Sequence, residues 1–112
     1  MEKLVTYKKY IFENAPLNVD DESDQFEVAN CNVISVQTIC NTVSGTVAID
    51  IQASNVGGSA PENWYTVETF SPGAGDSSRI YGPTSCGFIY VRAKITQTGG
   101  DGSCNVIVVG KA

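Results

Sequence analysis

The chain contains no histidine, and this limits the chemistry that its other side chains can perform. Histidine is the commonest general base and metal ligand, so Ser-His and Cys-His nucleophile systems are excluded. The cysteines have no basic cluster beside them in sequence that would lower a thiol pKa. Their spacing lacks the close C-x-x-C pairs of zinc sites and leaves only an unusual four-thiolate site. The sequence therefore favours buried free thiols, with the redox state open, at Cys31, Cys40, Cys86 and Cys104.

Two groups of carboxylates are the next candidates for chemistry. Glycosidases use two acids that flank a cleft, and Asp50 with Glu68 is one such combination on polar strand faces. A solvated charge is the simpler interpretation of both residues. The acidic stretch VDDESDQFE, centred on residues 20–24, offers oxygen ligands for calcium. It lacks the glycine and the flanking helices of an EF-hand, so a solvated acidic linker or a patch that faces a basic partner is favoured. We expect no catalytic residue, no metal site and no cofactor.

Trp64 and Tyr65 stand beside a polar loop in the stretch IQASNVGGSAPENWYTVETF. Such a pair occurs in sugar-binding platforms and also at the corners of β-sandwiches. A sugar platform usually uses several coplanar aromatic rings, whereas this chain has one tryptophan. We therefore favour a structural Trp64 that packs over one end of the sandwich, where its large area fills the core and its N–H meets a loop carbonyl. A surface contact through this loop would use Asn55, Val56, Asn63, Trp64 and Tyr65.

Length and charge restrict the class of partner. With 112 residues the chain suits one domain with a real core. Its formal charge is −5, from 12 acidic and 7 basic residues, whereas nucleic-acid binding needs Lys and Arg to displace counterions. No apolar run approaches the roughly 20 residues that span a bilayer, and the start lacks the apolar stretch of a signal peptide. We therefore expect no nucleic acid and no membrane as partner, and synthesis in a cytoplasm.

Short alternating segments must position these residues. The predicted inward positions are Ile34, Val36, Thr38 and Cys40; Val47, Ile49, Ile51 and Ala53; and Ile89, Val91, Ala93 and Ile95. WYTVETF and SCNVIVVG are further strands, and VSG and GGDG carry the residues of hairpin turns. No segment shows helical periodicity over three turns. The pattern predicts an all-β, antiparallel β-sandwich, jelly-roll or Ig-like in arrangement.

The first 24 residues differ in character from the rest of the chain. Val, Thr, Tyr, Ile and Phe dominate their start, which favours a strand or an extended arm over a helix or disorder. We therefore divide the chain into an extended N-terminal arm, residues 1–24, and a β-sandwich domain, residues 25–112. The arm residues expected to contact a partner are Leu4, Val5, Tyr7, Tyr10, Ile11 and Phe12.

The order of these segments resembles a class of small β-sandwich virion structural proteins of tailed bacteriophages. In that class a strand ending in x-x-S-N leads through a polar loop to x-W and a further strand. A Y-V-R-x-x-V strand then leads to a Gly-rich turn and a terminal valine-rich strand. The resemblance covers about residues 35–111, and the loop at 56–63 is longer than in many members. The matching positions are Ser54, Asn55, Trp64, Val67, Tyr90, Val91, Arg92 and the turn at 99–102.

The resemblance implies a non-enzymatic virion protein, either a capsid cement or decoration protein, a head fibre or a tail-associated module. We expect a cement or decoration protein that bridges and stabilises major capsid subunits, since many weak contacts on a closed shell add up. Its arm would add a strand to a partner sheet or fill a groove, and its sheet edges favour a homo-oligomer, dimer or trimer. It would be assembled into virions in the host bacterial cytoplasm. The alternative is a carbohydrate-binding or adhesion module of a phage fibre or tail, centred on Trp64 and Tyr65.

Overall fold

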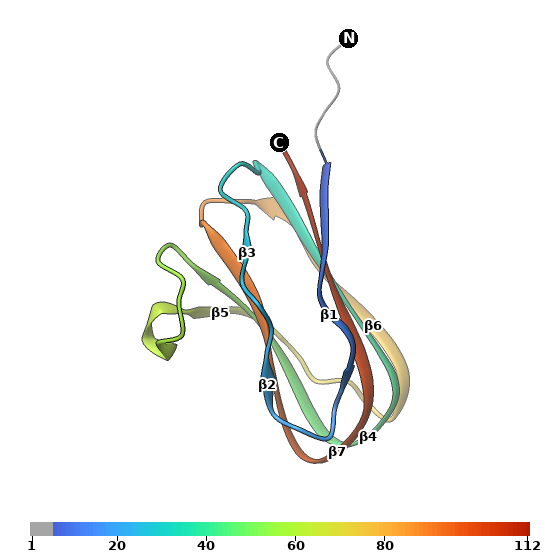
Figure 1. The fold of residues 1–112 in the computed structure, drawn as a ribbon. Helices are drawn as coiled ribbons and strands as arrows, with labels where there is room; N and C mark the ends of the chain where they lie inside the picture. Colours follow the sequence, from blue (N-terminus) through green and yellow to red (C-terminus); the bar gives the residue numbers. More distant parts are fainter. Residues whose placement is uncertain (1–5) are drawn as a thin grey trace.

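Seven strands and one short 3-10 turn form the fold in the computed structural model, which describes residues 6–112 (Figure 1). Every strand pair is antiparallel, which confirms the predicted all-β class. No helix within the described range is long and apolar enough to cross a membrane. The elements are β1 (Thr6–Pro16), β2 (Asp21–Glu22), β3 (Phe26–Glu27), β4 (Val33–Ser54), η1 (Pro61–Asn63), β5 (Tyr65–Phe70), β6 (Gly75–Ser85) and β7 (Tyr90–Lys111).

Two long strands, β4 and β7, organise the sheet. Each has 22 residues, and they pair along their whole length, from Val33 opposite Lys111 to Ser54 opposite Tyr90. Both strands bend midway, so that the two halves of the sheet face each other (Figure 1). One continuous sheet therefore supplies both layers of the sandwich.

The two layers share β4 and β7 and differ in their edge strands. Layer A has the order β1–β7–β4–β6 and contains residues 33–41 of β4 and 103–111 of β7. Layer B contains residues 46–54 of β4 and 90–98 of β7. Its edges are β5, beside β4, and the short strands β2 and β3, beside β7. In each layer, β4 and β7 are thus the central strands, with an edge strand paired on either side.

The bend lies at the two glycine-containing stretches for which the sequence predicts hairpins, VSG (43–45) and GGDG (99–102). β4 continues through the first stretch and β7 through the second, with shifts of register at this point. Gly45, Gly99 and Gly102 have φ angles of 73°, 61° and 110°, a backbone that tight turns and β-bulges both require. A Cβ at Gly45 would collide with the Gly99 carbonyl. The hairpin predictions are therefore wrong, because these glycines bend two paired strands and do not reverse them.

The core between the layers contains the residues that strand alternation predicts. Every predicted inward position within 34–40 and 47–53 is at most 7% exposed. Val91, Ala93 and Ile95 are fully buried. Ile89, predicted to join them, is half-buried, because it precedes β7 at the end of the sheet. The faces of the long strands are thus confirmed.

The N-terminal segment is part of the sheet from Thr6 onward. β1 pairs with residues 103–111 of β7, and β2 and β3 pair in layer B with residues 90–95 of the same strand. Between them, Leu17 is fully buried and its N–H donates to the Gly102 carbonyl at 2.9 Å. The predicted boundary after residue 24 falls between β2 and β3, both of which pair with β7.

Candidate functional site

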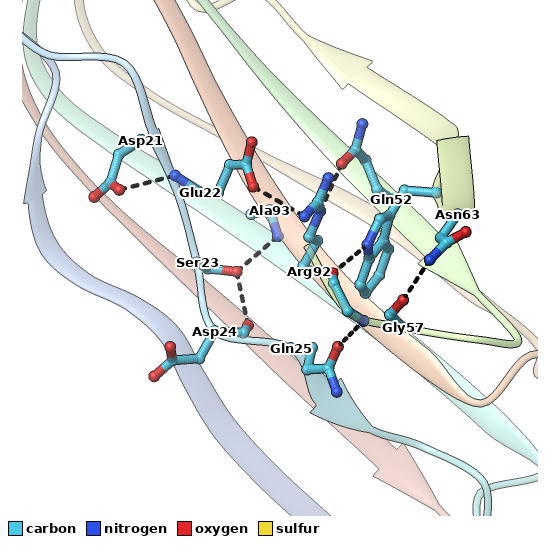
Figure 2. Close-up of polar contacts among 12 residues, drawn as sticks. Asp21, Glu22, Ser23, Asp24, Gln25, Gln52, Gly57, Asn63, Arg92 and Ala93 are labelled. Carbon is cyan, nitrogen blue, oxygen red and sulfur yellow. Dashed lines mark hydrogen bonds and ion pairs between the residues drawn. The ribbon is translucent and has the colours of Figure 1, made fainter. Parts of the chain in front are cut away.

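Arg92 is buried although it lies on the outer face of layer B, where its residue is only 4% exposed. Its Nε donates to Gln52 Oε1 at 2.8 Å and its Nη1 to Glu22 Oε2 at 2.9 Å (Figure 2). Its Cζ lies 4.3 Å from the centre of the Trp64 ring. An amide, a carboxylate and an aromatic face together compensate a cation that has lost water. Glu22, Gln52, Trp64 and Arg92 are named the Arg92 cluster.

The loop of residues 55–64 is held over the sheet by hydrogen bonds. Ser54 Oγ accepts from two N–H groups of the loop, at 3.0 and 2.7 Å. Trp64 Nε1 donates to the Gly58 carbonyl at 2.9 Å. Gln25 Oε1 accepts from the Gly58 N–H at 2.9 Å and joins the loop to the N-terminal segment (Figure 2). These bonds lay the Trp64 ring on Arg92.

The residues predicted for a loop contact divide into structural and exposed ones. Trp64 is 8% exposed and its N–H meets a loop carbonyl as predicted, but its ring packs on Arg92 and is not part of the hydrophobic core cluster. Asn63 is also engaged, since its Nδ2 donates to a loop carbonyl at 3.0 Å (Figure 2). The exposed members are Asn55, Val56 and Tyr65, the last two at 70% and 75%. Of the two adjacent aromatics, only Tyr65 presents its ring to solvent.

A shallow hollow of about 250 Å³ borders the cluster, lined by residues 22–25, Gly58, Ser59, Trp64 and Arg92. The Arg92 guanidinium uses two of its N–H groups and one of its faces for contacts within the protein, so its positive charge is already compensated. The cluster joins β2, β4, β7 and the loop before β5. Its arrangement is that of a structural clamp.

The acidic segment at residues 20–24 holds the N-terminal segment against β7. Asp20 Oδ1 accepts from the Gln97 N–H at 3.0 Å, and Ser23 Oγ accepts from the Ala93 N–H at 2.8 Å (Figure 2). Within residues 6–112, no three or more side chains of His, Cys, Asp or Glu gather into a potential metal site. The side chains of Asp20 and Ser23 thus accept hydrogen bonds from backbone N–H groups of β7.

Asp50 and Glu68 do not form a catalytic pair, because they lie on opposite faces of layer B. Asp50 is opposite Thr69, whose hydroxyl donates to Asp50 Oδ1 at 2.7 Å. Glu68 is opposite Ile51, which is buried, and forms an ion pair with Arg79 of β6. Residues directly opposite each other share a face of the sheet. The two carboxylates therefore cannot flank one cleft.

The four cysteines are free thiols, three of them buried and Cys86 half-buried. Burial raises the pKa of Cys40 to about 11 and that of Cys104 to about 12, and it also raises the pKa of Cys31. Only the thiolate is an effective nucleophile. These three thiols are therefore protonated near neutral pH and are not activated for catalysis.

The outer face of layer A carries apolar side chains that the sequence reasoning missed. Val33 and Ile80 are 37% and 56% exposed, and Ile107 and Val109 of β7 lie on the same face, half-buried. A hollow of about 240 Å³ lies among Val33, Ile80, Pro83 and Val109. Val33, Ile80, Pro83, Ile107 and Val109 are together named the layer A patch. The stretch NVIVVG indicates this patch in the sequence, because its apolar residues occupy both faces of the strand.

Of the six residues predicted for the arm, two are exposed, two are buried and two lie outside the described residues. Tyr7 and Tyr10 are 39% and 41% exposed, whereas Ile11 and Phe12 are 8% and 7% exposed and belong to the core. Tyr10 is opposite Ile107, so it borders the layer A patch. The two outside the described residues are Leu4 and Val5.

Comparisons with known proteins give a likeness of fold. No family model and no curated protein matches the chain. The chain is similar to the SPBc2 prophage-derived protein YomS, with a TM-score of 0.63 and 12% identity over 100% of this chain and 97% of the other. It is also similar to a chain of the Bacillus endospore appendages described as disulfide-linked pili (TM-score 0.54, 17% identity, 97% and 88% covered). A third similar structure is a chain of infectious bursal disease virus, Gx strain (0.55, 10%, 98% and 32%). At these identities the likeness shows the fold alone.

Proposed function

We propose that this protein is a non-enzymatic structural protein of a phage virion, a capsid cement or decoration protein that bridges and stabilises major capsid subunits. The observation that carries the proposal is the likeness of fold to a prophage-derived protein over 100% of this chain. The likeness to a chain of a virus and to appendage pili supports a role in assembly. The protonated thiols and the separated carboxylates of the described residues favour a role without catalysis.

Docking on the capsid uses the layer A patch together with the free edge of β1. Among residues 6–112, β1 pairs with β7 on one side only, so its other side offers N–H and C=O groups to a strand of a partner. Tyr7 and Tyr10 add exposed aromatic area on this edge, and aromatic residues contribute strongly to interfaces. Leu4 and Val5, which lie outside the described residues, stay part of the proposed partner contact. Ile11 and Phe12 support this edge from the core.

Several copies of the protein act together on the shell. Edge strands that remain open favour pairing between copies, and we propose a dimer or trimer in the virion. Many weak contacts on a closed lattice add up to stable attachment. The net charge of −5 is consistent with protein partners and with assembly in the host bacterial cytoplasm.

Co-sedimentation with capsids of the phage that encodes the protein tests this function. We expect the wild-type protein to pellet with capsids, and Ile80→Asp or Val33→Asp to weaken binding at least about tenfold, because each places a charge in an apolar contact. The matched control is Val56→Asp, which changes an equally apolar and 70% exposed residue of the layer B loop and is expected to bind normally. Circular dichroism verifies that each variant is folded.

The outcomes separate the parts of the proposal. Normal binding by both layer A variants would exclude the layer A patch as the docking surface. Binding to purified tails or fibres in place of capsids would assign the protein to a fibre or tail module. A protein that binds no virion component would overturn the proposed function.

A further inference from the structure

The four cysteines form two pairs in space. Cys40 of β4 and Cys104 of β7 are directly opposite each other in the ladder that joins these strands. Both are fully buried and belong to the core, so their side chains lie on the same face. Opposite residues of antiparallel strands have Cα atoms about 4.5–5.5 Å apart, within the 4.4–6.8 Å or so that a disulfide spans. The ladder thus places this pair at bonding separation.

The second pair meets at one backbone carbonyl. Cys31 lies in the turn before β4, and its N–H donates to the Val28 carbonyl at 3.0 Å. The Cys86 sulfur lies 3.7 Å from the same carbonyl oxygen and 3.4 Å from the Phe88 carbonyl oxygen, and the Cys86 N–H donates to the Asn32 carbonyl at 2.9 Å. Burial is the main cause of the raised pKa of Cys31 and of Cys104, and the partner thiol, Cys86 or Cys40, raises each pKa further.

The two pairs are well separated from each other. Val33 begins β4 next to Cys31, and the strand advances roughly 3.3 Å per residue from there to Cys40, or about 23 Å in all. At the other side of the ladder, the Cys31 sulfur packs against Gly110, six residues beyond Cys104 on β7. The pairs therefore occupy opposite ends of layer A. A site that gathers all four thiolates around one zinc ion is excluded by this distance.

We propose that the chain closes two intramolecular disulfides, Cys31–Cys86 and Cys40–Cys104, when it meets an oxidising environment. Four cysteines allow three pairings, and the ladder and the shared carbonyl select this one. The inference does not depend on the proposed function. A protein made with free thiols in a reducing cytoplasm would gain both cross-links after release from the cell.

The reaction is thiol–disulfide exchange with a small-molecule disulfide, such as oxidised glutathione. The Cys86 thiolate attacks one glutathione sulfur, and a glutathione thiolate leaves. The Cys31 thiolate then attacks the Cys86 sulfur, forms the protein disulfide and releases the second glutathione thiolate. The two protons lost by the cysteines are taken up by the two glutathione thiolates. The half-buried Cys86 makes this the first bond to form in the folded protein, whereas Cys40 and Cys104 react when β4 and β7 separate locally.

Refolding of the reduced full-length chain in a glutathione redox buffer tests the pairing, because glutathione can reach all four thiols before the chain has folded. After alkylation and non-reducing proteolysis, mass spectrometry is expected to find the peptides of Cys31 and Cys86 joined, and those of Cys40 and Cys104 joined. The intact mass is expected to fall by one hydrogen per cysteine. Closing two long loops is expected to raise the Tm by about 10 °C or more, and dithiothreitol is expected to reverse the rise.

Single variants separate the two bonds. Cys86→Ser is expected to keep only the Cys40–Cys104 bond, and Cys104→Ala only the Cys31–Cys86 bond. If Cys104→Ala fails to fold, the peptide map of the wild-type protein still decides both assignments. Cross-links in another pairing, cross-links between chains, or four alkylatable thiols in the refolded protein would each overturn the inference.

Discussion

The guanidinium of Arg92 is held by an amide, a carboxylate and an indole that come from three parts of the chain. Removing a cation from water is costly, and these groups offset the cost through hydrogen bonds, opposite charge and π electrons. Glu22 remains partly in contact with solvent, its side chain 46% exposed. The burial of Arg92, and of the Trp64 ring that covers it, therefore depends on these contacts.

Replacing Arg92 tests the clamp at the level of one side chain. Arg92→Met is expected to lower the free energy of unfolding by about 2 kcal/mol, because Gln52 loses a buried partner. Arg92→Lys is expected to recover only part of the loss, since an ammonium group lacks the planar fork. Urea unfolding followed by the fluorescence of Trp64, the one tryptophan of the chain, measures both.

The matched control is the second Arg–Glu pair of the protein. The side chain of Arg79 is 53% exposed in its ion pair with Glu68, and an exposed pair contributes about 1 kcal/mol or less. Arg79→Met is therefore expected to cost much less than Arg92→Met. Equal losses in the two variants would show that burial of Arg92 contributes nothing to stability.

At the scale of elements, the corner shared by β4 and β7 decides the fold. Gly45 has a φ of 73°, and a Cβ there would collide with the Gly99 carbonyl across the ladder. Gly45→Ala is expected to cost at least about 2 kcal/mol of unfolding free energy from backbone strain and the close approach. Gly73→Ala is the control, because a Cβ at Gly73 would meet nothing within 4 Å. Thermal unfolding compares the two, and similar Tm values would contradict a close-packed corner.

The sequence predicts the faces of the strands better than their connections. Alternation depends on neighbouring residues, so the inward positions of β4 and β7 could be predicted one by one. A glycine with positive φ serves a hairpin and a bulge equally well, and only the pairing partner decides between them. That partner lies about 50 residues away in the chain for Gly45 and Gly99.

The candidate site was difficult to predict for the same reason. Alternation places Arg92 on the outer face, but no local pattern indicates that Glu22 and Trp64 cover it. The loop carbonyl that accepts from the Trp64 N–H was predictable, because an indole N–H needs an acceptor once it is buried, whereas the packing of its ring on Arg92 was not. The layer A patch escaped notice, because apolar residues on both faces of β7 are also the pattern of a strand buried on both sides.

At the scale of the whole molecule, β7 is the strand on which the N-terminal segment depends. β1 pairs with its second half in layer A, and β2 and β3 pair with its first half in layer B. The segment therefore closes one side of both layers. It also adds Ile11, Phe12 and Leu17 to the core.

Two deletions distinguish a structural N-terminal segment from a separable arm. Removing residues 1–24 is expected to abolish cooperative thermal unfolding and to promote aggregation, because it uncovers the edge of β7 and removes core side chains. Removing residues 1–5 is the control and is expected to leave cooperative unfolding intact. Circular dichroism during heating, together with light scattering, measures both. A fragment of residues 25–112 that unfolds cooperatively near the Tm of the full chain would show that the segment is a separable arm. In that case the loss of capsid binding by the same fragment would assign docking to the arm, and retention of binding would assign it to the sandwich.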